Sequence, residues 1–450
     1  MGQRGGTTDM TRGAPAGLLL RVGLPLIAAN TLQQVYAMVD TVILGRFEGV
    51  GGLAVLGVCS WPVWLQVSIL TNFSQASSIL AARYYGQKDA EALRAAVGSM
   101  YSMALVLCAA MMVALQAAAR PLLVWQGAPP EMLEQGVAYL RILYAGTAVL
   151  FAYNLLAALL RAVGDGRTPL LAIAAAALVN VGLDVWFVAG LGLGAVGAAW
   201  ATVIAQAASA LVCLLRVRQI RELHIRRRHL RIRRSLLGDY MQLSVPMLMQ
   251  SFVIAFGGFF VQSHINRYGA AFVAGMSATT KVFSLLETAA IALAQAAATF
   301  VSQNYGAQAF DRIRRGVRIA VRISLGIAAL LAAGMALGGR GILSLYVAEE
   351  AIDTSWGYLM VMSAGLFIMY PMYVLRQSLQ ALGNAVVPLI AALVQLLARV
   401  LVTVTLPQVM GSRGMYFPTV VAWITSLVLI GAVFPFWLRR CERRAGQRAS

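Results

Sequence analysis

Residues 23–45, GLPLIAANTLQQVYAMVDTVILG, form an apolar stretch long enough to cross a membrane, with Pro25 near one end and Asp40 near the other. An ionised acid at the centre of a membrane helix costs about 2.5 to 3.5 kcal/mol even on the lenient insertion scale. An acid retained in such a stretch normally faces a cavity and has a function. Asp40 is therefore the first candidate for a functional residue.

The composition of the whole chain is that of a polytopic membrane protein. Hydrophobic residues make up 60% of the 450 positions and charged residues only 12%, whereas soluble proteins carry about 25% charged residues. The mean hydropathy is +0.75. We predict an all-α fold with twelve transmembrane helices, at residues 17–44, 53–80, 95–119, 133–160, 168–190, 194–215, 237–266, 271–302, 317–338, 355–382, 386–407 and 414–438.

The placement of the basic residues predicts the topology. With the N-terminus inside, the inner segments hold 26 Lys and Arg residues and the outer loops hold five, at Arg46, Arg120, Arg267, Arg340 and Arg413. This bias predicts that both termini lie in the cytoplasm. We expect the protein to lie in the cell inner membrane. The polar residues 1–16 precede an apolar run that is too long for a signal-peptide core, so we expect the first helix to be an uncleaved anchor.

The largest basic cluster contains nine arginines between Arg216 and Arg234. We interpret this cluster as a cytoplasmic connector that contacts anionic lipid head groups. A regulatory or nucleic-acid-binding role is the alternative, and we expect no nucleic-acid partner. Four scattered cysteines predict neither a disulfide framework nor a zinc site, and they lie at Cys59, Cys108, Cys213 and Cys441.

The two halves of the chain are internally repeated. Pro25 and Pro246 match at an offset of 221, and Gly164 and Gly383 match at 219. Because each half holds six helices, the copies share one orientation, and their interface is the natural place for a substrate cavity. The predicted regions are a tail at 1–16, an N-lobe at 17–215, a basic linker at 216–236, a C-lobe at 237–438 and a tail at 439–450.

Polar residues within the N-lobe runs form a candidate cation site. Asn180 and Asp184 are four residues apart and share one helix face, at a depth similar to that of Asp40. Two acids in one bundle repel each other unless they share a cation or a proton. Thr202 and Asn154 offer two more oxygens, although hydrogen bonding between helices would also explain them.

The C-lobe lacks this acidic cluster. The repeat places Val261, Tyr373, Arg399 and Thr403 where the N-lobe has Asp40, Asn154, Asn180 and Asp184. The buried charges predicted for the C-lobe either pair with one another or take part in transport, and they are Lys281, Glu287, Arg376 and Arg399. The chain has no GxxxxGK[ST], HExxH or aspartate-rich pair, so we expect no enzymatic activity and no cofactor.

Several motifs resemble those of the multidrug and toxic compound extrusion (MATE) transporters over nearly the whole chain. They are LPLIAANTLQQVYAMVDTVILGRF followed by LAVLG, then LLRAVGDGRTP, VNVGLDVWF and GAVGAAWATVIAQ, with FVSQNYGA and LQALGNAVVP in the second half. The resemblance implies two six-helix lobes that alternate between outward and inward access. It also implies export of amphipathic, often cationic, drug-like compounds against a proton or sodium gradient.

The resemblance is to the DinF-like branch, which keeps its coupling site in the N-lobe. It implies coupling roles for Asp40, Asn180, Asp184, Thr202 and Asn154, with Tyr139 beside them. The NorM-like branch carries additional acids in the C-lobe, whereas the seventh helix here has Gln250 and Gln262. We expect the substrate cavity to be lined by Tyr139, Tyr36, Gln33 and Met38.

We predict a monomeric, ion-coupled exporter whose first helix bends at Pro25. A flippase for a lipid-linked precursor is the alternative, and the paired acids and asymmetric halves argue against a channel or receptor. The coupling ion stays open between two readings. Oxygen ligands from Asp40, Asn180, Asp184 and Thr202 suit Na⁺, but the crowding of two carboxylates also favours binding of a proton.

Overall fold

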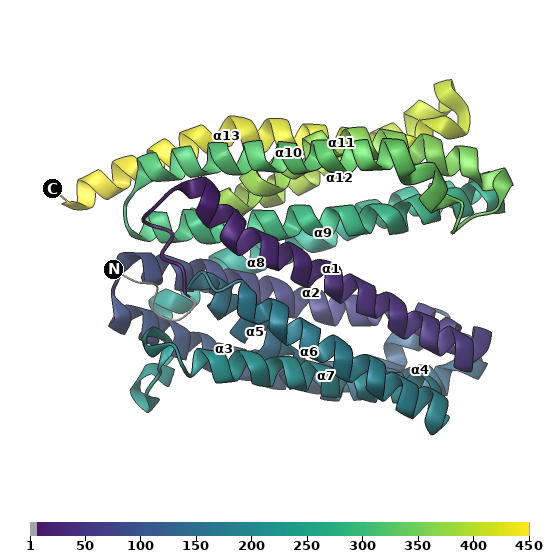
Figure 1. Ribbon diagram of the computed structural model, residues 1–450, viewed down its shortest axis with the longest axis horizontal. Coiled ribbons are helices and arrows are strands. Elements are labelled where there is room, and N and C mark those ends of the chain that lie inside the picture. The colour runs from purple at the N-terminus through teal and green to yellow at the C-terminus, as the bar shows by residue number, and fades with distance from the viewer. Residues whose placement is uncertain (1–6, 450) are drawn as a thin grey trace. The chain divides into compact units, whose positions relative to one another are not determined.

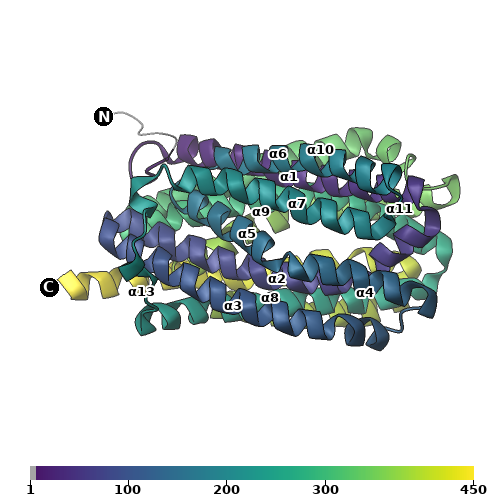
Figure 2. The same cartoon turned by 90° about the horizontal axis from the view of Figure 1, so that it is seen from below.

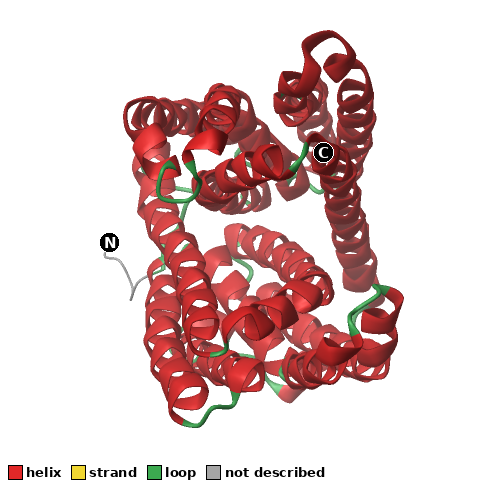
Figure 3. Ribbon diagram, turned by 90° about the vertical axis from the view of Figure 1, so that its right-hand side faces the viewer, coloured by secondary structure: helices red, strands yellow, loops and turns green. Residues whose placement is uncertain are grey.

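The structure is a computed structural model that describes residues 7–449, and these residues form helices without any strand (Figure 3). The first half contains α1 (Pro15–Phe47), α2 (Gly49–Gln87), α3 (Ala90–Trp125), α4 (Pro130–Ala145), α5 (Thr147–Ala162), α6 (Arg167–Asp184) with the π-helix η1 (Val185–Gly190), and α7 (Gly194–Val217). Two short 3-10 turns, η2 (Arg221–Leu223) and η3 (Arg227–Leu230), follow in the linker. The second half contains α8 (Arg234–Ile265), η4 (Asn266–Tyr268), α9 (Ala270–Gly306), α10 (Phe310–Leu343), α11 (Glu349–Ala381), α12 (Val386–Met410), η5 (Gly411–Tyr416) and α13 (Pro418–Ala449).

These helices confirm the predicted all-α membrane fold. Within residues 7–449, eleven segments are each long and apolar enough to cross a membrane. The bent pair of α4 and α5 supplies a twelfth span when the two helices are counted as one. The protein is therefore a multi-pass membrane protein, and Figure 1 shows the helices in chain order.

The fourth span differs from its prediction as one continuous helix over 133–160. It breaks at Gly146 between α4 and α5, which are inclined by 46° (Figure 2). A Cβ atom at Gly146 would come within 2.6 Å of Val203 Cγ2, so this position requires a residue without a side chain. The close approach of α7 explains the glycine at this position, and hydropathy alone does not predict a tertiary contact of this kind.

The described chain divides into two compact units. One unit contains Pro25–Met241 together with residues 7–9, and the other contains Met10–Leu24 and residues 242–449. In the first unit, α6 packs on α7, α2 on α5 and α5 on α7; in the second, α11 packs on α9, α10 and α13. The helix α1 begins in the second unit and continues in the first, and Pro25 is its first residue in the first unit.

The backbone of the two units shows the internal repeat independently of residue type. Lys88 and Gln308 are the non-glycine residues with a positive φ in the described chain, at 61° and 56°. Both follow long helices, α2 and α9, and they lie 220 positions apart, between the offsets of 221 and 219 found in the sequence. Left-handed glycines also recur at Gly164 and Gly383, with φ of 76° and 87°. The two halves therefore share a parallel repeat of six helices.

Candidate functional site

The site begins with the anchoring of α6. Asp165 is 2% exposed and its Oδ1 accepts hydrogen bonds from the backbone N–H groups of Arg167 and Thr168, at 3.2 and 3.0 Å. Arg216 Nε at the end of α7 donates to Asp165 Oδ2 at 3.0 Å. A carboxylate that accepts from the free N–H groups of a first turn fixes that helix end. Asp165 thereby fixes the register in which α6 presents its polar residues.

The buried face of α6 carries Asn180 and Asp184. Asn180 is 1% exposed and Asp184 is fully buried. Asp184 is also the last residue of α6, and the π-helix η1 begins at Val185. A π-helical turn is rare and recurs at functional sites, because its extra residue widens the turn and shifts the side chains beside it.

The carboxyl groups of Asp40 and Asp184 lie within hydrogen-bonding reach of each other. Asp40 Oδ1 and both oxygens of Asp184 are buried and receive no hydrogen bond from any donor in the described chain. Two facing carboxyl groups can form a hydrogen bond only when one of them carries a proton, and two ionised carboxylates need a cation between them. A proton shared by the two carboxyl groups, or a cation between them, would relieve this repulsion.

Two tyrosines surround the acid pair. Tyr139 on α4 is buried, and its hydroxyl interacts electrostatically with both Asp40 and Asp184. The Tyr36 hydroxyl hydrogen-bonds the Gln33 side chain and lies close enough to Asp40 to interact with its charge. Gln33 and Met38 are both exposed, on the same helix. The predicted cavity residues thus include two tyrosines near the acid pair and two exposed residues of α1.

The other predicted ligand residues differ in burial and in whether their polar atoms already form hydrogen bonds. Both polar side-chain atoms of Asn180 are buried without a hydrogen-bond partner in the described residues, so this amide is available to a ligand. Asn154 Nδ2 donates to the Leu150 carbonyl of its own helix at 2.9 Å, so only its oxygen remains to be offered. Thr202 is partly exposed on α7. Within residues 7–449, no three His, Cys, Asp or Glu side chains are placed to hold a metal ion together.

The second unit holds a different polar group. Tyr373 Oη donates a hydrogen bond to Glu287 Oε1, and the Arg376 guanidinium lies 4.0 Å above the Tyr373 ring. Arg399 is 7% exposed and its Nη1 donates to the Ile254 carbonyl at 3.4 Å. Its Nε is buried without a partner among the described atoms. Tyr373 was expected only as the counterpart of Asn154, and no sequence spacing indicated its bond to Glu287.

The four buried charges predicted for the C-lobe do not form ion pairs with one another in the described chain. Each ion pair within 4.0 Å there joins other residues. Lys281 also differs from its prediction as a buried charge, because its side chain is exposed. A lysine can lie on a helix surface with its ammonium group directed outward while its aliphatic stem packs on apolar atoms. Glu287 therefore accepts a hydrogen bond from Tyr373, and Arg376 lies over the ring of that tyrosine. No salt bridge to Glu287 is found in the described chain.

Comparison with known families agrees with this architecture. The family profile MatE matches residues 25–186 and 246–405, which together cover most of the chain. The two matched segments start at Pro25 and Pro246, the prolines that pair in the internal repeat.

Individual relatives point the same way. The chain is 27% identical over 355 residues to "Probable multidrug resistance protein YoeA" of Bacillus subtilis, which covers 75% of this chain and 76% of that protein. It is 30% identical over 210 residues to "DNA damage-inducible protein F" of Escherichia coli, covering 46% and 45%.

Solved structures match the fold over nearly its whole length. A structure described as "MATE in complex with MaL6" superposes with a TM-score of 0.91 at 20% identity, covering 98% of this chain and 100% of that one. A MOP superfamily transporter from Pyrococcus furiosus superposes with a TM-score of 0.90 at 21% identity, covering 98% and 99%. The profile match over both halves shows that this chain belongs to the multidrug and toxic compound extrusion (MATE) family of membrane transporters.

Proposed function

We propose that this protein is an ion-coupled antiporter that exports amphipathic, often cationic drugs or toxic compounds by alternating access. The relatives named as multidrug resistance proteins support this substrate class. We place the protein in the cell inner membrane as a monomer with both termini in the cytoplasm, because the Lys and Arg residues concentrate on one side of the helices.

The observation that carries the proposal is the facing pair of Asp40 and Asp184. Asp40 Oδ1 and both oxygens of Asp184 are buried without donors from the described chain, and the amide of Asn180 lies on the same helix face as Asp184 without a partner. A buried polar group that lacks a partner costs about 1 to 3 kcal/mol, and an unpaired charge costs more. Binding of a proton or Na⁺ would satisfy these groups and remove this free-energy cost.

Proton and Na⁺ compete for this pair in our proposal. One proton converts two repelling carboxylates into a hydrogen-bonded pair, and one Na⁺ between them removes the same repulsion. Binding of either ion changes the charge beside Tyr36 and Tyr139, and so couples the ion to a substrate on that surface. Protons are the proposed physiological partner, with Na⁺ as the alternative.

The proposed hinge is Pro25. Proline lacks a backbone N–H, so the carbonyl of Arg21 loses its partner within α1. The chain also passes from one compact unit to the other between Leu24 and Pro25. Two solved relatives are described as "MATE in the bent conformation" and "MATE in the straight conformation", which supports a conformational change in proteins of this fold.

Gradient-driven efflux in proteoliposomes tests the proposal. Asp40→Asn and Asp184→Asn should each abolish efflux driven by a proton or sodium gradient, because each keeps the side-chain volume but removes the ionisable group. Asp239→Asn is the matched control, since Asp239 is exposed at the start of α8 and should tolerate the same change. Normal export by either site variant, in protein that inserts like the control, would reject the coupling site.

A further inference from the structure

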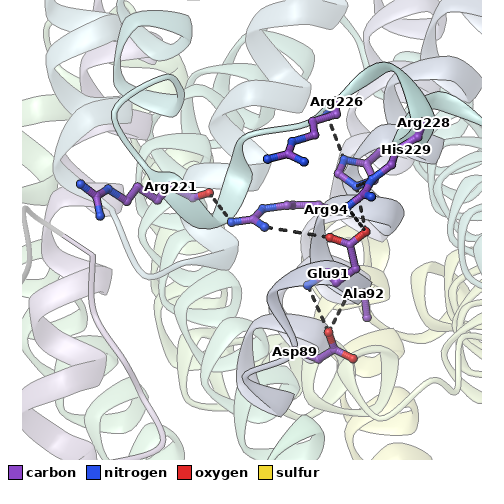
Figure 4. Close-up of polar contacts among 8 residues, drawn as sticks. All are labelled: Asp89, Glu91, Ala92, Arg94, Arg221, Arg226, Arg228 and His229. Carbon is purple, nitrogen blue, oxygen red and sulfur yellow. Dashed lines mark hydrogen bonds and ion pairs between the residues drawn. The ribbon is translucent and has the colours of Figure 1, made fainter.

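The linker between the two halves is a folded cap on α3 (Figure 4). Arg228 Nη2 and His229 Nε2 lie 2.9 and 3.0 Å from Glu91 Oε1, and His229 Nδ1 accepts the backbone N–H of Arg226 at 2.9 Å. A Cβ atom at Gly98 would overlap the His229 carbonyl, so the linker lies directly on the helix. The basic linker is therefore built into a defined position on the first unit.

This cap closes one end of a pocket of about 990 Å³ within the first unit. Its walls come from α3, α5, the end of α7 and the linker, and they include Leu105, Phe151 and Leu214. The pocket residues on α3 run from Arg94 to Cys108, about 21 Å at 1.5 Å per residue. One leaflet of a bilayer has a hydrocarbon thickness of about 15 Å, so the pocket is long enough to follow an acyl chain.

The polar end of the pocket carries only positive charge. Arg94, Arg218, Arg221 and Arg226 line it, and no Asp or Glu does. None of the ion pairs found in the described chain uses the last three arginines. Arg94 Nη2 donates to the Arg221 carbonyl at 3.1 Å, whereas its Nε is buried without a partner in the described structure. Arg94 also lies 4.0 Å from the exposed Glu91, and the Arg221 side chain is directed away from Arg94 (Figure 4). Several arginines at one end of an apolar pocket are suited to bind a phosphate.

The apolar end opens to the side of the helices. Leu105 is 73% exposed although it lines the pocket, and Ala148 and Ala152 on α5 are also exposed. This surface would be covered by a chain of methylene groups that enters from the bilayer. The proposed cationic substrates are poor occupants, because four arginines would repel them.

We propose that this pocket, which we name the α3–α5 lipid pocket, binds one anionic phospholipid. The phosphate lies at the end of the pocket that the arginines line, and one acyl chain lies along the walls from α3 and α5. The proposal specifies the lipid contact that we expect for the basic linker. It rests on the proposed membrane orientation in one respect, which is that the lipid comes from the cytoplasmic leaflet. It is independent of the coupling ion, because lipid binding is measured without transport.

The test measures phospholipid binding to the full-length protein in detergent by native mass spectrometry. Phosphatidylglycerol should bind at least tenfold more tightly than phosphatidylcholine of the same chains. The triple substitution R218Q/R221Q/R226Q should weaken phosphatidylglycerol binding about tenfold or more, because it removes three positive charges from the polar end of the pocket. The matched control R227Q/R231Q/R233Q removes the same charge from linker residues that do not line the pocket. Equal losses in both triple variants would overturn the pocket in favour of diffuse charge attraction.

A second pair of variants distinguishes a lipid from a free phosphate compound. Ala152→Trp fills the apolar wall at an exposed position, and Ala110→Trp places the same bulk at an exposed position of α3 outside the pocket. The first should reduce phosphatidylglycerol binding about tenfold and the second should not. Glycerol 3-phosphate, offered as the head group alone, should not compete. Competition by glycerol 3-phosphate, or unchanged lipid binding in Ala152→Trp, would overturn the assignment of a phospholipid.

Discussion

Asn180 combines two properties at the scale of single residues that seldom occur together. It is 1% exposed, and neither its amide nitrogen nor its amide oxygen has a partner among the described residues. A buried amide of this kind destabilises the folded state, because its hydrogen bonds to water are lost and not replaced. Its presence beside Asp184 is explained if the amide oxygen binds the transported cation.

Asn180→Leu should therefore separate stability from function. The substitution replaces an unsatisfied amide by an apolar group with the same branched shape and the same number of heavy atoms, so the thermal midpoint of the purified protein should stay unchanged or rise, by the equivalent of about 1 to 3 kcal/mol. Ion-driven efflux should be lost. Asn384→Leu serves as the contrast, because Asn384 Oδ1 accepts the Val387 N–H at 3.0 Å and its loss should lower the midpoint. A marked destabilisation by Asn180→Leu would show that Asn180 has a structural partner.

At the scale of elements, α1 joins Asp40, an acid of the proposed ion site, to Pro25 through one helix. Asp40 lies fifteen residues after Pro25, about 22 Å along the helix axis. A change in charge at Asp40 is thus linked to the point where the chain passes between the compact units. The π-helix after Asp184 offers a second adjustable turn beside the same pair.

Pro25→Ala should slow export more than it lowers drug affinity, since it restores an N–H donor and stiffens α1. Stopped-flow efflux rates and equilibrium drug binding give the two quantities. Pro62→Ala is the control, because Pro62 lies inside α2, which belongs wholly to the first unit. An unaltered transport rate in Pro25→Ala, or equal slowing in both variants, would rule out the hinge.

The sequence predicted the positions of the helices better than it predicted their local breaks and irregular turns. Helix length and apolar character were sufficient to predict the spans, and the shared helix face predicted that Asn180 and Asp184 lie together. The requirement for a glycine at Gly146 depends on the approach of Val203, and the bond from Tyr373 to Glu287 joins two separate helices. Such contacts depend on tertiary packing, which hydropathy and spacing do not record. The π-helix after Asp184 likewise has no sequence signal.

At the scale of the whole molecule, the two halves share a fold but place different polar and charged side chains in it. The backbone repeats closely, with matching left-handed positions at Lys88 and Gln308. The acid pair occurs only in the first unit of the described chain, and the second unit places a tyrosine-bound Glu287 and a buried Arg399 instead. The repeat supplies the fold, and divergence of the side chains restricts the proposed ion site to one half.

Glu287→Gln tests this asymmetry. Glutamine keeps an oxygen that can accept the Tyr373 hydrogen bond, so the second unit should stay folded. Efflux should keep its dependence on the sodium or proton gradient, with a rate within about threefold of wild type. The same assay on Asp184→Asn provides the comparison. If Glu287→Gln loses coupling as completely as Asp184→Asn, both halves take part.

Sodium binding to the purified protein as a function of pH tests the central claim most directly. If one proton and one Na⁺ compete for the Asp40 and Asp184 pair, falling pH fills the site with protons and raises the apparent sodium dissociation constant. The rise should approach about tenfold per pH unit once the proton is the dominant occupant. Binding should be absent in Asp184→Asn and unchanged in Asp239→Asn. A sodium affinity that is independent of pH, or intact in Asp184→Asn, would contradict the account and place the ion elsewhere.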